Sequence, residues 1–495
     1  MPWEELSGMK LRRWRRAAFG RSSCPMRWGW CAGSGLLLVI SLIALLPGAA
    51  AETRWRVGVA RRDITPVGPI WMGGYASRDH PSEGVLQPLA AKALIVEDRR
   101  GSRVAFVCMD LIGVDARLCD EVAQRAFAST GIARERIIFN SSHTHCGPVI
   151  AGVTPIVYNL DADQQEAVDA YTEKLKDKLV DLISAAAKDL GPADLLHGEG
   201  KATFGANRRA MRGMKNPSPD PAAPCDHAVP VIVARDPDGK LRAVLFGYAC
   251  HATTTAIFRI NGDYPGYAQA DIEGAHPGAT ALFLAGCGGD TNPHPRGEIG
   301  MAKLHGRELA TAVTAILNSP MQGLDGALDV VSQTVELKLV DAPRKEELQR
   351  LLNDKNAYRQ RLARHLLAEL GAGRGLPSSC RCLIQVVRFG EDAMLVAIPG
   401  EPVIDYALRL RREFAGHRLW VAGYCNEIFA YVPSERVLKE GGYEGGEAMM
   451  YFGLHGAFRP GLEEQIVGAI KHLARAWMTG RFDSTRANAP VMVMP

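Results

Sequence analysis

Apolar runs and amphipathic stretches alternate along most of this chain of 495 residues. Short apolar runs bounded by polar or turn-forming residues predict β-strands at 103–108, 136–140, 243–249, 281–285, 393–398 and 419–423. Helical periodicity predicts α-helices at 114–129, 163–189, 264–275, 301–318, 403–416 and 462–479. Apolar strands between amphipathic helices are typical of a sheet covered on both faces. We therefore predict an α/β fold with one or more mixed sheets and covering helices.

Most of the chain, residues 52–480, is predicted to form a single large domain, because no shift in composition divides it. The segment 343–371 is rich in charged, helix-forming residues. It is predicted to be a helical insertion whose charges face solvent. Residues 214–226 have the composition of a Pro-rich loop. Residues 481–495 lack periodicity and are predicted to be a tail.

The first 51 residues have the pattern of a membrane-targeting segment. Basic side chains precede the apolar run 36–46, and the small residues Ala49 and Ala51 fit a cleavage site before Glu52. This pattern predicts a signal peptide and therefore an exported protein, periplasmic or secreted. The 24 uncharged residues 28–51 are also long enough to remain as an N-terminal membrane anchor, so the leader 1–51 has both interpretations.

The net charge of +4 comes from this leader and not from the rest of the chain. Residues 1–51 carry seven basic and two acidic side chains, which leaves 51 basic and 52 acidic side chains beyond them. A nucleic-acid-binding protein needs a basic face on its folded part, so nucleic acid is not an expected partner. The 47% of hydrophobic residues excludes a mainly disordered chain.

Polar residues interrupt the apolar pattern directly after predicted strands, where open α/β sheets place their ligands. In the stretch 137–148 (IIFNSSHTHCGP), His143 and His145 are two residues apart. Strand alternation would point their side chains to opposite faces. We therefore expect one of them to bind a metal and the other to act as an acid, a base or an orienting group. Two structural histidines are the alternative.

Two further strand ends carry a candidate metal ligand. His251 follows the strand predicted at 243–249 and precedes three threonines, whose hydroxyls could hold the imidazole tautomer. Glu401 follows a Pro-Gly turn and opens the next predicted helix. The alternatives are a buried structural histidine and a carboxylate that stabilises a helix N-terminus. Two imidazoles, a carboxylate and an open position match catalytic zinc, although the chain has no HExxH helix.

These places, together with a late Gly-rich stretch, resemble the neutral/alkaline (non-lysosomal) ceramidase family. VGVARRDITP at 57–66 and WMGGYA at 71–76 are similar to its first strand and loop, and SSHTHCGP at 141–148 resembles its T-H-T-H-S-G-P motif. The other similar stretches are GANRR at 205–209, ACHATT at 249–254, NGDYPGYA at 261–268, PGEP at 399–402, and Asn426 with Tyr431 and Tyr443. The resemblance extends from about residue 57 to about residue 455.

By position, the resemblance implies a Zn2+ ion held by His143, His251, Glu401 and Tyr431. It also implies that His145, Arg208 and Tyr443 lie beside the substrate carbonyl. Taken without the resemblance, Arg208 fits a solvated basic loop, and the two tyrosines fit an ordinary surface position.

The chain departs from the family pattern in two respects. The family's G-D-V-S-P-N hexapeptide contains an active-site serine, whereas GCGGDTNP at 286–293 has Asn292 there. Asn292 offers no hydroxyl for nucleophilic attack, but its amide could donate a hydrogen bond to an oxyanion. The family's C-terminal immunoglobulin-like domain is also expected to be absent, since the chain ends soon after the helix predicted at 462–479.

We therefore expect an exported zinc-dependent amidohydrolase that cleaves the N-acyl amide bond of ceramide or a related lipid amide by metal-activated water. Arg208, Tyr443 and His145 would stabilise the oxyanion and protonate the leaving amine. An apolar channel for the acyl chain should then reach the metal.

The expected partner is a small lipid-like amide, and association with a membrane surface is expected if the leader stays as an anchor. The alternatives are a zinc hydrolase for another acylated substrate, or an exported lipid- or glycan-binding homologue without catalysis. The sequence determines no oligomeric state.

Overall fold

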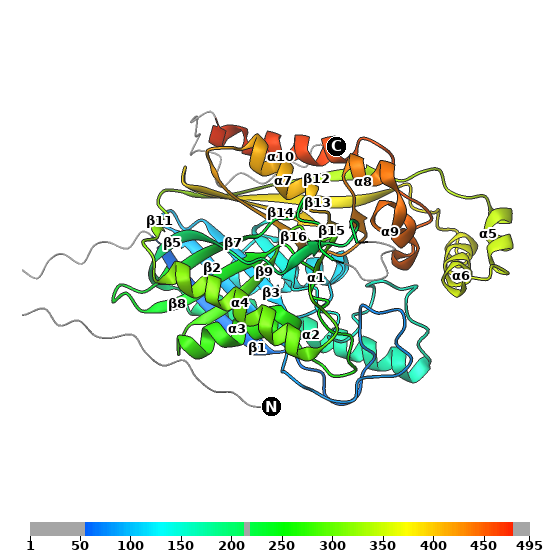
Figure 1. The fold of residues 1–495 in the computed structure, drawn as a ribbon, viewed down its shortest axis with the longest axis horizontal. Helices are drawn as coiled ribbons and strands as arrows, with labels where there is room; N and C mark the ends of the chain where they lie inside the picture. The colour runs from blue at the N-terminus through cyan, green and yellow to red at the C-terminus, as the bar shows by residue number, and fades with distance from the viewer. Residues whose placement is uncertain (1–54, 212–217, 479–495) are drawn as a thin grey trace, which may run out of the picture. The chain divides into compact units, whose positions relative to one another are not determined.

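The computed structural model describes residues 55–211 and 218–478 (Figure 1). The predicted leader 1–51 and the predicted tail 481–495 lie outside these residues. Within the described part of the chain, no helix has both the length and the apolar character needed to cross a membrane.

A thirteen-stranded mixed sheet forms the centre of the described residues. Along its hydrogen-bonded order the strands are β12 (Leu328–Lys338), β13 (Ser379–Phe389), β14 (Ala393–Pro399), β16 (Arg418–Cys425), β4 (Ile137–Ser141), β3 (Arg103–Met109), β2 (Ala90–Asp98), β1 (Trp55–Asp63), β5 (Gly191–Lys201), β7 (Ala228–Arg235), β8 (Leu241–Tyr248) and β9 (Thr280–Ala285), with β11 (Gln322–Gly323) beside β5. The pairs β14–β16, β3–β4 and β8–β9 are parallel, and the other pairs are antiparallel. The predicted α/β class with a mixed sheet is confirmed.

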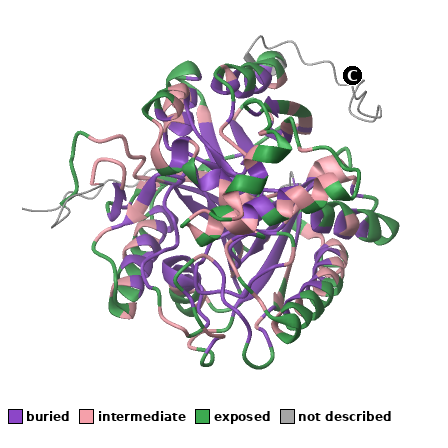
Figure 2. Ribbon diagram, turned by 90° about the vertical axis from the view of Figure 1, so that its right-hand side faces the viewer, coloured by how far each residue is buried: buried purple, intermediate pink, exposed green. Residues whose placement is uncertain are grey.

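The sheet folds back on itself, so that β9 at one end of the order lies against β16, β4, β3 and β2. Gly286, the residue after β9, forms a bridge with Ala422 of β16. One apolar core therefore collects inward-facing side chains from strands along the whole order, among them Trp55, Phe106 and Leu395. Figure 2 shows this concentration of buried positions in the strands.

Helices cover the outer faces of the sheet in three groups, each with its own apolar cluster. The groups are α1 (Ala116–Thr130) with α2 (Ala162–Lys188), α3 (Asp263–Ala275) with α4 (Ile299–Leu317), and α7 (Asp405–Glu413) with α10 (Leu462–Met478). The remaining elements are α5 (Lys345–Leu351), α6 (Ala357–Gly371), α8 (Glu435–Glu440), α9 (Gly442–Gly445), the 3-10 helices η1 (Arg134–Arg136) and η2 (Glu447–Phe452), and the short pairs β6 (Gly205–Asn207) with β10 (Thr291–Pro293) and β15 (Glu401–Pro402) with β17 (Tyr431–Val432).

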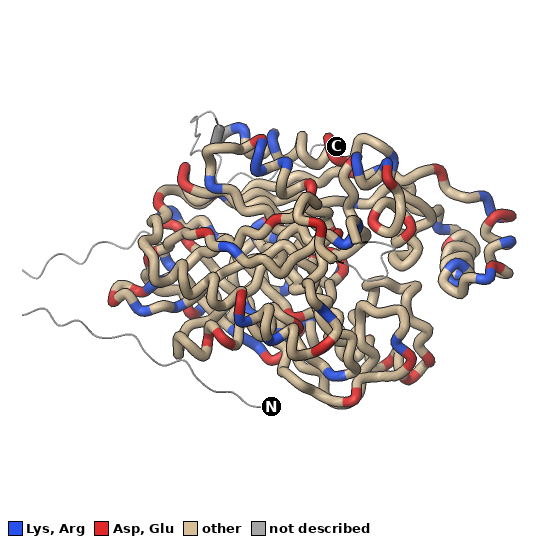
Figure 3. Tube along the Cα trace, in the orientation of Figure 1, with Lys and Arg blue, Asp and Glu red and all other residues tan. Residues whose placement is uncertain are grey.

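The predicted elements all occur, most of them with ends shifted by one or two residues. The helix predicted at 403–416 is shorter and covers 405–413, because the residues at both of its predicted ends form turns or loop. The strands β2, β5, β7, β12 and β13 were not predicted. Polar side chains break the apolar pattern of β12 and β13. The insertion predicted at 343–371 consists of two helices, α5 and α6, and Figure 3 shows acidic and basic positions interspersed along them.

Helix α2 illustrates how local signals place an element. Asp161 and Gln164 form a reciprocal capping box at its start, and buried residues at helical spacing, including Leu175 and Leu179, face the sheet. The helix approaches β1 so closely that a Cβ added to Gly58 would lie 1.9 Å from the backbone oxygen of Ala186. Only glycine fits between β1 and α2 at that position.

We therefore expect Gly58→Ala to lower the free energy of unfolding by about 1–3 kcal/mol or more, because backbone must shift to admit the methyl group. Urea unfolding followed by circular dichroism measures the change. Gly468→Ala is the matched control, since Gly468 is exposed in α10 with nothing near an added Cβ. The control is expected to be neutral or up to about 1 kcal/mol more stable. Equal stability of Gly58→Ala and the native protein would contradict the described packing.

Candidate metal centre

Several strands end at one place in the fold. Strands β4 and β16 run antiparallel and pair only at Asn140 and Cys425, near the end of each strand. The buried Asn140 side chain donates from Nδ2 to the backbone oxygen of Gly423 at 2.8 Å and accepts from the backbone nitrogen of Ala285 at 2.9 Å. This amide joins β4, β9 and β16, so the segments that follow them begin close together.

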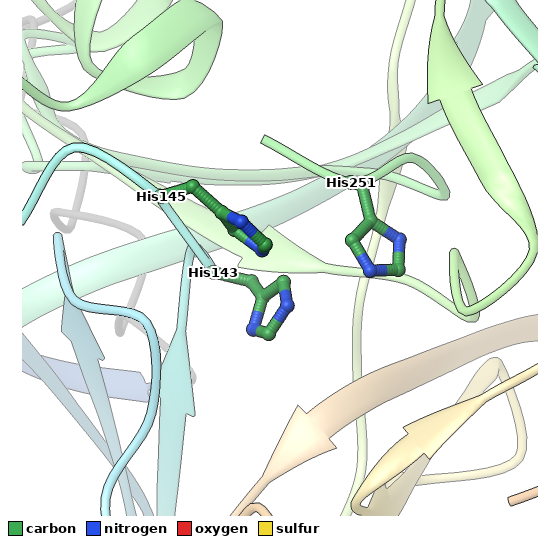
Figure 4. Close-up of side chains that lie close together, drawn as sticks. All are labelled: His143, His145 and His251. Atoms are coloured by element: carbon green, nitrogen blue, oxygen red, sulfur yellow. The ribbon is translucent and has the colours of Figure 1, made fainter. Parts of the chain in front are cut away.

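His143 lies in the segment after β4 and has a left-handed backbone conformation, with φ of 60°. The prediction that His143 and His145 point to opposite faces is wrong, because this residue breaks the strand alternation. Their rings lie 4.8 Å apart, and His251, which follows β8, lies 4.8 Å from His143 (Figure 4). The three imidazoles offer nitrogen atoms within 4.8 Å of one another and could hold a metal ion.

Two of these imidazoles have a fixed tautomer. Nδ1 of His143 lies 2.6 Å from the backbone oxygen of Ile112, and Nδ1 of His251 lies 2.6 Å from that of Gly288. A carbonyl oxygen only accepts hydrogen bonds, so each Nδ1 carries the proton and each Nε2 of the neutral ring is free to bind a metal. The predicted role of the threonine hydroxyls in holding the tautomer of His251 is taken by the carbonyl of Gly288.

Glu401 lies opposite both free nitrogens. Its Oε2 is 3.2 Å from Nε2 of His143 and 3.0 Å from Nε2 of His251. The prediction that Glu401 opens a helix is wrong. Glu401 lies in β15, where it pairs with Tyr431 of β17, and α7 begins only at Asp405. The hydroxyl of Tyr431 is 3.2 Å from Nε2 of His251. The four residues of the predicted ligand set are therefore together and buried.

The donor set fits a cation. Nε2 of neutral His251 and the Glu401 carboxylate are both acceptors, so their close approach is unfavourable unless a positive charge lies between them. Burial, followed by the nearby Arg208, lowers the pKa of His251 to about 4, so its ring is neutral at pH 7. Burial would raise the pKa of Glu401, but its imidazole neighbours hold it well below its usual value.

The spacing also fits a tetrahedral ion. Ligand atoms about 2.0–2.1 Å from zinc lie about 3.3 Å apart at tetrahedral angles. The three contacts among Nε2 of His143, Oε2 of Glu401, Nε2 of His251 and the hydroxyl of Tyr431 measure 3.2, 3.0 and 3.2 Å. Burial, followed by the Glu401 charge, raises the pKa of Tyr431 well above its usual value, so the phenol keeps its proton until a cation offsets that charge.

His145 has a different environment from the other two histidines. Neither of its ring nitrogens has a hydrogen-bond partner among the described residues, although the ring is buried. Burial, together with His143 and His251, lowers its pKa well below its usual value, so the ring is neutral. A Cβ on Gly74 would lie 2.3 Å from this ring, so only a glycine at position 74 lets its backbone pack directly against His145. The free nitrogens suit proton exchange with a substrate.

Arg208 and Tyr443 lie beside Tyr431. The Arg208 guanidinium is 5.5 Å from the ring centres of both tyrosines. Its Nη1 donates to Oδ1 of Asn292 at 3.4 Å, while its buried Nη2 has no hydrogen-bond partner among the described residues. Tyr443 lies in α9, and 37% of its surface remains exposed. The interpretation of Arg208 as part of a solvated loop is therefore wrong.

Asn292 lies in β10, which pairs with β6 just before Arg208. Its Oδ1 accepts from Arg208 and, at 3.3 Å, from the hydroxyl of Thr253. Asn292 therefore contacts Arg208, which was predicted to stabilise the oxyanion, rather than a candidate metal ligand.

The buried carboxylate of Asp290 joins the segments that carry these residues. It accepts from the backbone nitrogen of Ile404 at 2.8 Å and from Nδ2 of Asn207 at 3.0 Å. The backbone oxygen of Asp290 also accepts from the backbone nitrogen of Arg208 at 2.8 Å. One residue thus ties the loop before Arg208 to the turn that follows Glu401.

A cavity of about 230 Å³ reaches three of the four candidate ligands, His143, Glu401 and Tyr431. Its walls contain His143, His145, Glu401, Tyr431 and Tyr443, and are otherwise largely apolar or aromatic: Tyr75, Ile112, Val153, Val157, Tyr158, Ile428, Tyr451 and Phe452. A larger cavity of about 470 Å³, lined by polar groups such as His197 and Arg411, shares none of these residues.

The helical insertion supports the walls of this cavity. Tyr358 of α6 donates to the backbone oxygen of Ala76 at 3.0 Å and packs on Tyr451 with ring centres 5.2 Å apart. Arg361 donates to the backbone oxygens of Ile156 and Val157 at 2.9 and 3.0 Å. Arg361 therefore faces the protein, whereas other charged side chains of the insertion, such as Lys345 and Arg350, are exposed as predicted.

Two residues near the site were missed from the sequence. Tyr424, at the end of β16, is buried with φ of 53°, and its ring lies 4.6 Å from that of His143. Its position at a strand end, like that of His143, was the available signal. Glu444 is buried and binds Arg208. Only its position next to Tyr443 could have indicated it.

The fold and this cluster define a class: α/β proteins with a buried cluster of imidazoles and a carboxylate that could hold a metal ion at the ends of sheet strands. Residues 55–313, just over half of the chain, match the sequence profile described as "neutral/alkaline non-lysosomal ceramidase, N-terminal". The chain belongs to the neutral/alkaline non-lysosomal ceramidase family.

Individual relatives are similar over different lengths. Neutral ceramidase 1 of Arabidopsis thaliana is 26% identical over 198 residues, which are 39% of this chain but only 25% of that protein. The neutral ceramidase of Mycobacterium tuberculosis is 25% identical over 476 residues, covering 79% of this chain and 74% of the relative. The crystal structure of neutral ceramidase from Pseudomonas aeruginosa matches with a TM-score of 0.68 at 22% identity, over 89% of this chain and 77% of that one. This structural match supports the fold.

The geometry predicts that two histidines differ in their effect on metal binding. We expect His251→Ala to lose most of the bound metal, because Nε2 of His251 faces Glu401, whereas His145→Ala retains about one ion per chain. Inductively coupled plasma mass spectrometry on the purified variants measures the metal. Full metal content in His251→Ala, or its loss in His145→Ala alone, would exclude the proposed ligand set.

A second prediction concerns stability and pH. Burial raises the pKa of Asp290 from 3.8 to about 6, so the folded protein holds this proton more tightly than the unfolded chain. The resulting stability is present below about pH 4 and is lost as pH rises to about 6. Relative to Asp290→Asn, the native protein should lose up to about 3 kcal/mol over this range. Urea unfolding at several pH values measures this difference, in which the other titrating groups cancel. Parallel pH profiles would contradict the prediction.

Proposed function

We propose that the chain is a zinc-dependent hydrolase that cleaves the N-acyl amide bond of ceramide or a related lipid amide. The observation that supports this most directly is the cavity, because the same walls carry apolar side chains and three of the four candidate metal ligands. An acyl chain held by Val153, Val157 and Phe452 would bring its amide carbonyl to His143 and Glu401. Membership of the ceramidase family supports the same substrate class.

His143, His251, Glu401 and Tyr431 would hold the zinc ion. When bound, zinc supplies a Lewis acid that polarises a carbonyl and lowers the pKa of a water. The protein contributes rings with fixed tautomers and a buried carboxylate that offsets part of the ion's charge.

Three residues would act on the substrate directly. The free Nη2 of Arg208 donates to the oxygen on which negative charge develops as the carbonyl is attacked. Burial raises the pKa of Tyr443, so its hydroxyl remains a hydrogen-bond donor. The neutral ring of His145 has two free nitrogens, one of which accepts a proton while the other donates one to the leaving amine.

Asn292 supports water as the nucleophile. A side-chain amide cannot form the acyl intermediate that a serine forms, and Oδ1 of Asn292 already accepts from Arg208 and Thr253. Its contribution is to hold Arg208.

We also propose that the protein is exported, on the basis of the basic and apolar leader 1–51. An uncleaved leader would hold the hydrolase at a membrane, where lipid amides are found.

The test is a substrate panel with N-octanoylsphingosine, N-palmitoylsphingosine, an N-acylated amino sugar and a dipeptide. Equal amounts of fatty acid and sphingosine should be released, and activity should vanish on chelation and return with zinc. His143→Ala should lower kcat/KM by more than about 100-fold, since loss of partners outside the metal shell already costs about 10–100-fold. His80→Ala, at an exposed histidine, is the control. Full activity after chelation, or in His143→Ala, would refute the proposal, and activity only on the sugar or the peptide would replace the substrate class.

A further inference from the structure

Glu444 is a buried carboxylate that none of the roles described so far requires. It follows Tyr443 in α9 and is 3% exposed. Its Oε1 accepts from Nε of Arg208 at 2.7 Å, and its Oε2 accepts from Nη1 of Arg209 at 2.6 Å. Burying a carboxylate is costly unless its oxygens are paired, and here each oxygen accepts from one arginine.

The two contacts of Glu444 are not equivalent. Arg209 also donates from Nη2 to Glu440 at 2.8 Å and to the backbone oxygen of Gly441 at 3.1 Å. The turn and the loop before it therefore stay joined through Arg209 even without Glu444. What Glu444 alone supplies is the partner for Nε of Arg208.

That partner sets the direction of the guanidinium. The group is planar, and its donors have a fixed geometry. With Nε held by Glu444 and Nη1 directed to Asn292, only Nη2 remains without a protein partner among the described residues. The rings of Tyr431 and Tyr443, each centred 5.5 Å away, limit rotation of the plane.

We propose that Glu444 is a positioning residue that holds Arg208 so that Nη2 faces the substrate carbonyl. This inference rests on the proposed function for the identity of the group that Nη2 faces, the substrate carbonyl. The orientation of Arg208 itself does not depend on the substrate. Glu444 acts on the substrate through Arg208 and does not touch it.

A simpler role for Glu444 makes the opposite prediction. If its charge only neutralised Arg208, removing that charge would leave the guanidinium more positive and stabilise an oxyanion better. Glu444→Gln would then hydrolyse faster and bind anions more tightly. Positioning predicts slower hydrolysis and weaker anion binding. The glutamine side chain no longer pairs strongly with Nε of Arg208, and Nη2 therefore moves.

The experiment is a double-mutant cycle with Glu444→Gln, Arg208→Ala and the double variant, each checked for zinc content and thermal unfolding. We expect Glu444→Gln to lower kcat by about 10–100-fold with KM changed less than about threefold, and to have no further effect in the Arg208→Ala background. The matched control is Glu440→Gln, which removes a carboxylate from the same Arg209 without contacting Arg208. Unchanged or faster hydrolysis in Glu444→Gln, or equal losses in both backgrounds, would overturn the proposal.

Two additions make every outcome decisive. If Glu444→Gln does not fold, Glu444→Asp keeps the charge but shortens the reach: positioning predicts the same fall in kcat, and neutralisation predicts the native rate. Binding of octanoate by calorimetry repeats the cycle without turnover. If the native protein hydrolyses no amide, the proposed function fails, while weaker octanoate binding in Glu444→Gln, and not in Glu440→Gln, still supports the positioning role. Tighter or unchanged octanoate binding would refute it.

Discussion

The site is governed by one electrostatic constraint: acceptor atoms of His251 and Glu401 face each other in a buried space, 3.0 Å apart. Such a contact is stable only with a positive charge between the atoms. The groups around these atoms keep His251 from donating a proton to Glu401. Backbone oxygens of Ile112 and Gly288 keep the protons of both candidate ligand histidines on Nδ1, and burial with Arg208 opposes protonation of His251. This arrangement therefore fits a cation held between His251 and Glu401.

The fold meets this constraint by bringing strand ends together. Because the sheet folds back on itself, segments after β4, β8, β14 and β16 approach one another although they are far apart in the sequence. Asn140 fixes three strands at this point, and Asp290 ties the loops beyond them. The insertion then braces the cavity walls through Tyr358 and Arg361. The metal-type site, the apolar cavity and the arginine beside them thus depend on contacts between distant segments.

The sequence was sufficient for the fold class, for the positions of six strands and six helices, and for the strand ends at which His143, His251 and Glu401 lie. Those features follow from local apolar pattern and from residue type. It was insufficient where one backbone angle decides: the left-handed conformation of His143 reversed the expected direction of its side chain. It also gave no indication of the pairing of Glu401 with Tyr431, since strand pairing between distant two-residue segments leaves no periodic signal. The roles of Glu444 and Asp290 were also missed, because a buried carboxylate cannot be distinguished from a surface carboxylate in the sequence.

Anomalous X-ray diffraction from crystals of the purified protein, recorded on both sides of the zinc absorption edge, shows whether zinc binds between His251 and Glu401. We expect one anomalous peak within about 2.0–2.2 Å of Nε2 of His143, Nε2 of His251 and the Glu401 carboxylate. A structure in which these atoms meet without a metal, or in which the peak lies against His145 and leaves Glu401 unbound, would contradict it.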